Sequence, residues 1–364
     1  MDLAFLHRLY EGESPVASVH LDTSRATHDA DQRIELRWRA ALRSLTDQGA
    51  DPETLAVLGR AVGGVAEVPG PQGEALFASG GRLLGAFTLA EPPAADTARL
   101  LPVPDPLGLV LDRDHQLPHV VVAVDREGGD VSAYPAAAHE PSLERTFNGS
   151  TLHISRVRAG AEAQASFHRR SVNLWTENTR QVADDVRAAA AEVDAAVVLI
   201  AGDPKAIGLL REHLSERPPV GELVYGEGGR SDVSARAALR ASVDVAMRTA
   251  MTARHLDALA TLEAELAEGR AAQGVPAVQE ALTAGRVATL LLAADRTDDP
   301  DLYASRRDPL ALGTDPAALG DDPTAFRAPA APLLLRAAAL SGASFTEILP
   351  PARATDGVAA LLRY

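Results

Sequence analysis

Apolar positions in the first third of the chain predict a small domain of strands and helices. Residues 16–21 form a short strand-like run, and residues 31–45 then repeat apolar side chains at helical spacing. Gly80-Gly81 is typical of a tight turn, and it predicts a hairpin between strand-like runs at residues 75–79 and 83–89. We expect an N-terminal mixed α/β domain over residues 1–114.

The middle of the chain alternates strand and helix patterns, which predicts an α/β layer around a mixed sheet. It follows a connection at residues 100–116, where three closely spaced prolines exclude a regular helix. Asp203 and Pro204 have the residue types of a helix N-cap and first position. We expect a central domain over residues 115–226, with strands at 119–125, 131–134, 152–157, 196–201 and 221–225 and helices at 171–193 and from 204.

The last third predicts a further α/β domain over residues 227–364, a small α/β/α sandwich. A long helix at residues 232–268 opens it, and at 1.5 Å per residue it would be ~55 Å long. An acidic, proline-rich stretch at 295–323 is interpreted as a solvated loop. The remaining expected elements are helices at 275–284 and 331–340 and strands at 287–293, 344–349 and 358–362.

Composition narrows the functional classes. The 364 residues are 46% apolar, enough for a core in each domain, and carry 50 acidic against 35 basic side chains, for a formal charge of −15. Such a chain is repelled by nucleic acid on average, so an RNA contact needs a local basic patch. The absence of cysteine excludes disulfides, thiolate zinc sites and a cysteine nucleophile. No apolar run spans a membrane and the start lacks a secretory pattern, so we expect a cytoplasmic protein.

The common catalytic and cofactor motifs are missing from the sequence, and we expect no cofactor and no metal. His20 and Asp22 alternate along a strand and could orient a metal, although such a pair is more often a hydrogen-bonding pair of the sheet. Asp125 could join Asp184 or Asp203 in a nuclease-type cluster. The alternative is that Asp125 serves a turn and Asp203 caps a helix.

One basic stretch stands out in this acidic chain. Residues 145–180 contain six arginines against two glutamates, with His153 and His168 among them. At the centre lies a small-residue segment, 158–166, flanked by arginines, and small residues allow close backbone approach while guanidinium groups suit phosphate. We interpret residues 156–170 as a basic loop, either an RNA-probing tip or an ordinary flexible loop.

Several segments resemble a known family. The segments are His119 to Asp130, Phe167 to Arg170, Trp175 to Thr179, Val197 to Pro204 and Gln279 to Leu292. They resemble archaeal and eukaryotic class-I peptide release factors and Pelota, and the whole chain is most similar to the bacterial branch that includes the hibernation factor Balon and its actinobacterial relatives. The resemblance implies a ribonuclease-H-like central domain and a C-terminal domain like kink-turn-binding ribosomal proteins.

The same resemblance bears on activity. In release factors a Gly-Gly-Gln tripeptide positions the hydrolytic water, and here Gly160-Ala161-Glu162 stands in its place, with Gln164 two residues late. We therefore expect a non-enzymatic factor in the A site of idle or stressed ribosomes, with elongation factor Tu as a possible partner by family analogy. Its expected rRNA-binding residues are Arg156, Arg158, Gly160, Gln164, His168, Arg169 and Arg170.

Two alternatives stay open from the sequence. One is a peptidyl-tRNA hydrolase or rescue factor that uses Gln164 or Glu162 as its catalytic residue. The other is a stress-linked interaction module that kept the fold and lost ribosome binding.

Overall fold

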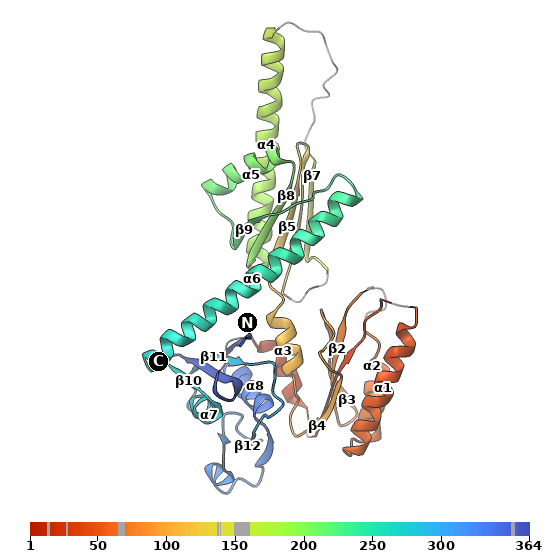
Figure 1. Ribbon diagram of the computed structural model, residues 1–364, viewed down its shortest axis with the longest axis vertical. Coiled ribbons are helices and arrows are strands. Elements are labelled where there is room, and N and C mark those ends of the chain that lie inside the picture. Colours follow the sequence, from red (N-terminus) through yellow and green to blue (C-terminus); the bar gives the residue numbers. More distant parts are fainter. Residues whose placement is uncertain are drawn as a thin grey trace. The chain divides into compact units, whose positions relative to one another are not determined.

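The computed structural model divides the chain into two compact units, residues Met1–Asp114 with His255–Tyr364, and residues His115–Arg254 (Figure 1). Each of the three predicted segments contains its own sheet, while the division into three domains stays a prediction. The structure describes residues 1–12, 15–26, 28–64, 70–136, 138, 140–148, 161–350 and 354–364, with the backbone alone for 161–175.

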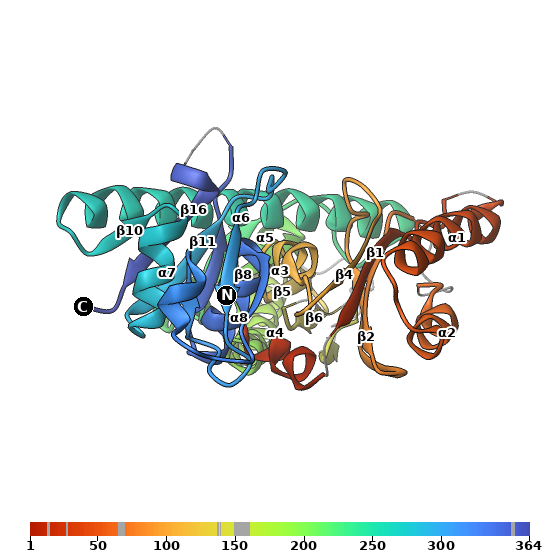
Figure 2. The same ribbon diagram turned by 90° about the horizontal axis from the view of Figure 1, so that it is seen from below.

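The N-terminal part of the first unit is a four-stranded antiparallel sheet in the order β3-β2-β1-β4. Helices α1 and α2 cover one face, where Trp38, Leu45, Leu58 and Leu76 form the core (Figure 2). The predicted hairpin is confirmed, because Gly80 and Gly81 both have the positive φ that its turn needs. The elements are η1 (Ala4–Glu11), β1 (Val16–Asp22), α1 (Ala30–Asp47), α2 (Pro52–Ala61), β2 (Gly73–Ser79), β3 (Arg82–Leu89), β4 (Thr97–Leu101) and α3 (Leu107–Asp114).

The C-terminal part is the predicted α/β/α sandwich. Its sheet has the order β10-β16-β11-β15, with α7 and α8 on one face and the end of α6 on the other (Figure 2). On the α6 face Leu262 packs with Leu291, Ile348 and Ala359. The elements are the end of α6 (Val233–Ala267), β10 (Ala271–Gln273), α7 (Val275–Thr283), β11 (Val287–Leu292), α8 (Ala330–Leu340), β15 (Ser344–Glu347), η3 (Thr355–Gly357) and β16 (Val358–Leu362).

The acidic stretch at 295–323 is not the solvated loop that its composition predicts. It supplies β12 (Asp301–Ala304), β13 (Leu312–Gly313) and η2 (Pro316–Leu319), and β12 and β13 join β14 (Phe326–Pro329) in a second small sheet. Leu302 and Ala304 alternate inward and are buried in the core, while Asp301 stays exposed. Two inward side chains among many carboxylates leave too weak a pattern to recognise from the sequence.

The central unit holds a five-stranded mixed sheet in the order β7-β6-β5-β8-β9. Strands β5, β6 and β7 pair antiparallel, and β8 and β9 add in parallel, which fits the expected ribonuclease-H-like domain. Val182, Val186 and Leu210 of α4 and α5 pack on the sheet. The elements are β5 (His119–Val124), β6 (Gly128–Tyr134), β7 (Leu143–Asn148), α4 (Ala161–Val193), β8 (Val197–Gly202), α5 (Pro204–Glu216) and β9 (Glu222–Tyr225).

Two expectations about this unit change. The third strand predicted at 152–157 lies outside the described residues, and the strand that the structure shows is β7. Helix α4 begins at Ala161, ten residues before the predicted start near Ser171. The segment that we interpreted as a loop for its small residues contains alanine, glutamate and glutamine, which are strong helix formers.

A buried carboxylate joins the parts of the first unit. Asp114, at the end of α3, is fully buried, and its Oδ2 lies 2.8 Å from Nε2 of His255 in α6. The same oxygen accepts hydrogen bonds from the Glu347 backbone N–H at 2.9 Å and the Thr346 hydroxyl at 3.3 Å, both in β15. The N-terminal ammonium group of Met1 lies 3.9 Å from Oδ1. One side chain thus connects α3, α6, β15 and the N-terminus.

We expect Asp114→Ala to lower the free energy of unfolding by about 3–5 kcal/mol, because the substitution removes the buried carboxylate that His255, Thr346 and Glu347 contact. Chemical denaturation followed by circular dichroism measures the change. Glu35→Ala is the control, since it removes an exposed pair with Arg39 and should cost less than about 1 kcal/mol. Equal stability of both variants would contradict the role of Asp114.

Candidate functional site

The residues predicted to contact RNA lie around the start of α4. Arg156, Arg158 and Gly160 fall at 149–160, outside the described residues. The structure places Glu162, Gln164, His168, Arg169 and Arg170 in the first turns of α4 and describes only their backbone. The basic loop predicted at 156–170 is therefore wrong for residues 161–170, which are helical. Positions 162 and 164 are about 200° apart around the helix axis, so they lie on different faces.

Helix α4 is much longer than the sheet that supports it. Its 33 residues span about 50 Å, whereas the six residues of β5 span about 20 Å. The described buried side chains begin at Asn178 and continue to Ala190, all in the C-terminal half. The N-terminal part of α4 projects beyond the end of the sheet (Figure 1). The fold thus holds the first turns of α4 away from the body of its unit.

The charges of the basic stretch divide into two groups. Arg145 pairs with Asp185 at 3.0 Å, and Arg180 lies 3.8 Å from Glu177, so both are balanced by the protein's own carboxylates. The other four arginines fall at residues 149–175, where Glu162 is the single acidic residue, for a formal charge of +3. The positive charge left over in this stretch is therefore concentrated at the projecting end of α4 and the segment before it.

Arg230 fixes the strand that leads to this segment. Its Nε lies 3.6 Å from Asp125 and 3.4 Å from Asp130. Its two Nη atoms donate to the Phe147 carbonyl and to the Asn148 side chain, at the end of β7. The side chain is mostly buried, with 18% exposed. Sequence reasoning missed this residue, since its partners are distant in the chain.

The three aspartates of the suggested nuclease cluster have separate structural roles. Asp125 accepts the backbone N–H groups of Glu127 and Gly128, at 2.8 and 2.9 Å, so it serves the turn. Asp203 accepts the N–H groups of Lys205 and Ala206, at 2.9 and 3.2 Å, and caps α5. Asp184 pairs with Arg187 at 2.8 Å. The turn and cap interpretations are confirmed.

The environment of Asp203 keeps it ionised. Burial acts to raise its pKa, but the backbone N–H groups of Ala206 and Lys205, together with Arg126 at 3.1 Å, lower the pKa below its ordinary value. Such a carboxylate is a cap and an ion-pair partner rather than a proton donor. Within the described ranges, His, Asp and Glu side chains form no group of three that could hold a metal ion.

His20 and Asp22 also have structural partners. His20 is buried in β1, with Nδ1 3.3 Å from the Thr97 hydroxyl, and burial lowers its pKa, so the neutral ring is favoured. Asp22 pairs with Arg37 at 2.7 Å and accepts the Ser24 backbone N–H. The hydrogen-bonding interpretation of this pair is therefore supported over the metal site.

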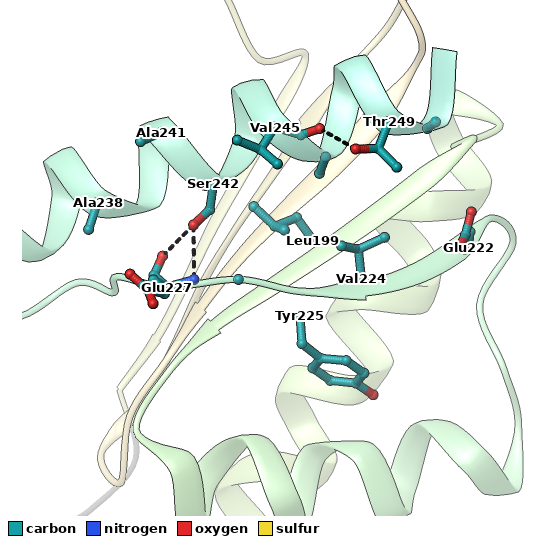
Figure 3. A pocket seen from close by; sticks show the side chains of 13 residues that line it. Leu199, Glu222, Val224, Tyr225, Glu227, Ala238, Ala241, Ser242, Val245 and Thr249 are labelled. Atoms are coloured by element: carbon teal, nitrogen blue, oxygen red, sulfur yellow. Dashed lines mark hydrogen bonds between the residues drawn. The ribbon is translucent and has the colours of Figure 1, made fainter. Parts of the chain in front are cut away.

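A groove of about 480 Å³ lies between β9 and α6 (Figure 3). Its walls are mainly apolar, with Leu199, Val224 and Val245 among them, and the charged residues among its described lining are Glu222 and Glu227. The Ser242 hydroxyl is used within the wall, where it donates to the Glu227 carbonyl and accepts the Glu227 N–H. The groove offers no cation to a phosphate and no nucleophile–base pair.

Comparison with known proteins places this arrangement in a family. Residues 118–268, from β5 to the end of α6, match the family model of bacterial archaeo-eukaryotic release factor family 2. The uncharacterized protein Rv2629 of Mycobacterium tuberculosis strain H37Rv is 30% identical over 290 residues, covering 79% of this chain and 77% of that protein. The chain belongs to the bacterial archaeo-eukaryotic release factors. The uncharacterized protein MT2704 of M. tuberculosis strain CDC 1551 matches this chain with the same identity and the same coverage.

Solved structures similar to this release-factor-family chain come from archaea and yeast. Ribosome-bound archaeal Pelota, solved with ABCE1, has a TM-score of 0.41 and 15% identity and covers 100% of this chain and 94% of its own. Dom34 of S. cerevisiae has a TM-score of 0.40 and 7% identity, over 80% and 79%. The archaeal termination factor aRF1 has a TM-score of 0.26 and 17% identity, over 100% and 97%. At these values no residue role transfers to this chain.

None of the helices in the described part of the chain is long and apolar enough to cross a membrane.

We expect Arg230→Ala to loosen the end of β7, because it removes two ion pairs and two hydrogen bonds from one partly buried guanidinium group. Amide hydrogen exchange at residues 143–148 should become about tenfold faster. Arg180→Ala, which removes an exposed pair, should leave exchange at these amides unchanged. Unchanged exchange in Arg230→Ala would show that Arg230 does not fix β7.

Proposed function

We propose that this protein is a non-enzymatic translation factor that binds the A site of idle or stressed ribosomes. The observation that carries the proposal is the projecting start of α4, which bears Arg169 and Arg170 and directly follows the sequence segment with Arg156 and Arg158, in a chain of formal charge −15. In an acidic protein, such a local cluster is where rRNA phosphates are attracted rather than repelled. Membership of the release factor family supports ribosomal RNA as the partner, and one similar solved structure is of a ribosome-bound protein.

The absence of activity is part of the proposal. Gly160-Ala161-Glu162 replaces a neutral glutamine amide by a carboxylate at the position expected to face the peptidyl ester. A carboxylate is repelled by the surrounding phosphates and cannot donate the amide's hydrogen bonds. The helical backbone at 162–164 also puts positions 162 and 164 on different faces of α4.

In this proposal the guanidinium groups of Arg156, Arg158, Arg169 and Arg170 contact rRNA phosphates, and Gly160, Gln164 and His168 lie against RNA at the tip. The N-terminal domain faces the decoding region. Elongation factor Tu is proposed as the partner that delivers the protein. Because most of the surface is acidic, we expect affinity to fall steeply as salt rises.

We expect the double variant Arg158→Glu/Arg169→Glu to lose ribosome binding by at least about tenfold in co-sedimentation, with and without elongation factor Tu. Removing two phosphate contacts should also flatten the slope of log Kd against log salt by about two. The matched control is Arg211→Glu/Arg240→Glu, which makes the same charge change at two exposed residues of the same unit and should bind as wild type. Wild-type protein that stays in the supernatant at low salt under both conditions, or a charge-reversed variant that still sediments, would overturn the proposal.

We expect no release of labelled peptide from ribosomes that carry peptidyl-tRNA, above the rate without factor. Release that Glu162→Ala or Gln164→Ala abolishes would instead show a peptidyl-tRNA hydrolase. Single-turnover release assays with saturating factor distinguish the two, because slow binding then no longer limits the signal.

A further inference from the structure

A second cavity, of about 340 Å³, lies inside the unit formed by residues 1–114 and 255–364. It lies between the N-terminal sheet and the C-terminal sandwich, so its walls come from distant parts of the chain. The lining residues of this interdomain cavity are Leu9, Tyr10, Gly12, Val16, Pro102, Val103, Pro104, Arg306, Phe326 and Arg336.

The first polar group of the cavity is a buried guanidinium. Arg336, on α8, has 8% of its surface exposed, and its Nη1 donates to the Ser305 carbonyl at 2.9 Å. Within the described ranges no carboxylate lies within 4.0 Å of it to form an ion pair. Burial lowers the pKa of Arg336, and the positive charge of Arg306 acts in the same direction. The side chain is therefore a poorly hydrated cation that, among the described residues, has no carboxylate in direct contact.

A second arginine lies beside it. The guanidinium carbon of Arg306 is 5.0 Å from the centre of the Phe326 ring, and that of Arg336 is 5.9 Å from the same centre. One aromatic ring contributes a modest attraction to each cation, but it does not cancel the repulsion between them. An anion between the two guanidinium groups would cancel this repulsion.

The third polar group is a hydroxyl with nothing to bind. The Tyr10 oxygen is buried and, among the described residues, has no hydrogen-bond partner. Burial raises the pKa of Tyr10, so at neutral pH the group is a protonated donor. A buried hydroxyl without a partner costs free energy, and a ligand that accepts its hydrogen bond would remove this cost.

The nearest acidic groups do not complete the site. Asp105 pairs with Arg99 at 3.1 Å, and Asp308 accepts the Leu310 backbone N–H at 2.9 Å. Asp105 affects the pKa of Tyr10, and Asp308 affects the pKa of Arg336, only through longer-range charge. Among the described residues, no carboxylate forms an ion pair with Arg336 in the cavity.

We propose that this interdomain cavity binds a small organic oxyanion, whose phosphate or carboxylate oxygens accept hydrogen bonds from Arg336 and Tyr10. A guanidinium group and a neutral phenol are donors only toward such a ligand, and an oxyanion offers only acceptors. The rest of the wall is apolar, with Leu9, Val16 and Val103, so the ligand carries an apolar or aromatic body next to its charged head. The size of the cavity suits a small molecule.

The test uses full-length protein and three probes in isothermal titration calorimetry, inorganic phosphate, phenyl phosphate and benzoate, each against sodium chloride at equal ionic strength. We expect saturable binding, with phenyl phosphate about tenfold tighter than inorganic phosphate because its ring is buried on the apolar wall. Preference for phenyl phosphate over benzoate identifies a phosphate ligand, and the reverse preference identifies a carboxylate. If none of the probes binds saturably, the proposal is overturned.

Two variants of the cavity and one control variant test whether the probes bind specifically in the cavity. Tyr10→Phe and Arg336→Met should each weaken the tightest probe by about tenfold, as expected for the loss of a hydrogen bond to a charged group. Arg327→Met, on the same strand as Phe326 but exposed and paired with Asp301, should bind as wild type. Equal affinity in all three variants would show non-specific anion binding and would overturn the proposal.

Stability provides the second readout. Tyr10→Phe should not lower the unfolding midpoint in the absence of ligand, because the deleted hydroxyl has no partner among the described residues. It should lose the rise in midpoint that phenyl phosphate gives to wild type. This variant keeps the test decisive if Arg336→Met fails to fold. The proposal is independent of ribosome binding, which depends on the central unit.

Discussion

The structure of the first unit depends on the buried contact between Asp114 and His255. These two residues are also where the chain passes to and from the central unit, since Asp114 ends one segment of the first unit and His255 begins the other. Because α3, α6 and β15 all meet at one carboxylate, the N-terminal sheet and the C-terminal sandwich behave as a single body despite the 140 residues inserted between them. Removal of one partner from such a buried pair is strongly destabilising.

Much of the secondary structure could be predicted from the sequence because it depends on local patterns. The apolar runs that became β5, β8 and β11 are buried on both faces, and the cap at Asp203 followed from its residue type. The same signal occurs at Asp51-Pro52, which caps α2, and it was overlooked there. Strand β7 was missed for a different reason, since it is an exposed edge strand with little apolar pattern.

The sites were harder to predict than the elements. The basic stretch was visible because its arginines are close in sequence, but its small residues were interpreted as a loop when they favour a helix. Arg230 and the oxyanion cavity left no sequence signal, since Tyr10, Arg306 and Arg336 meet only after the first and last parts of the chain have packed together. A buried polar group indicates a binding site when it lacks a hydrogen-bond partner, and this can be judged only in the folded chain.

The length of α4 has a mechanical consequence. About 22 Å of continuous helix extends from the part that is packed on the sheet, so the helix acts as a stiff lever with its pivot near Asn178. A rotation of about 10° at the pivot would displace the far end by about 4 Å, which is more than the length of a hydrogen bond. Small repacking of Val182 or Val186 against the strands would therefore be converted into a large change of reach at the tip.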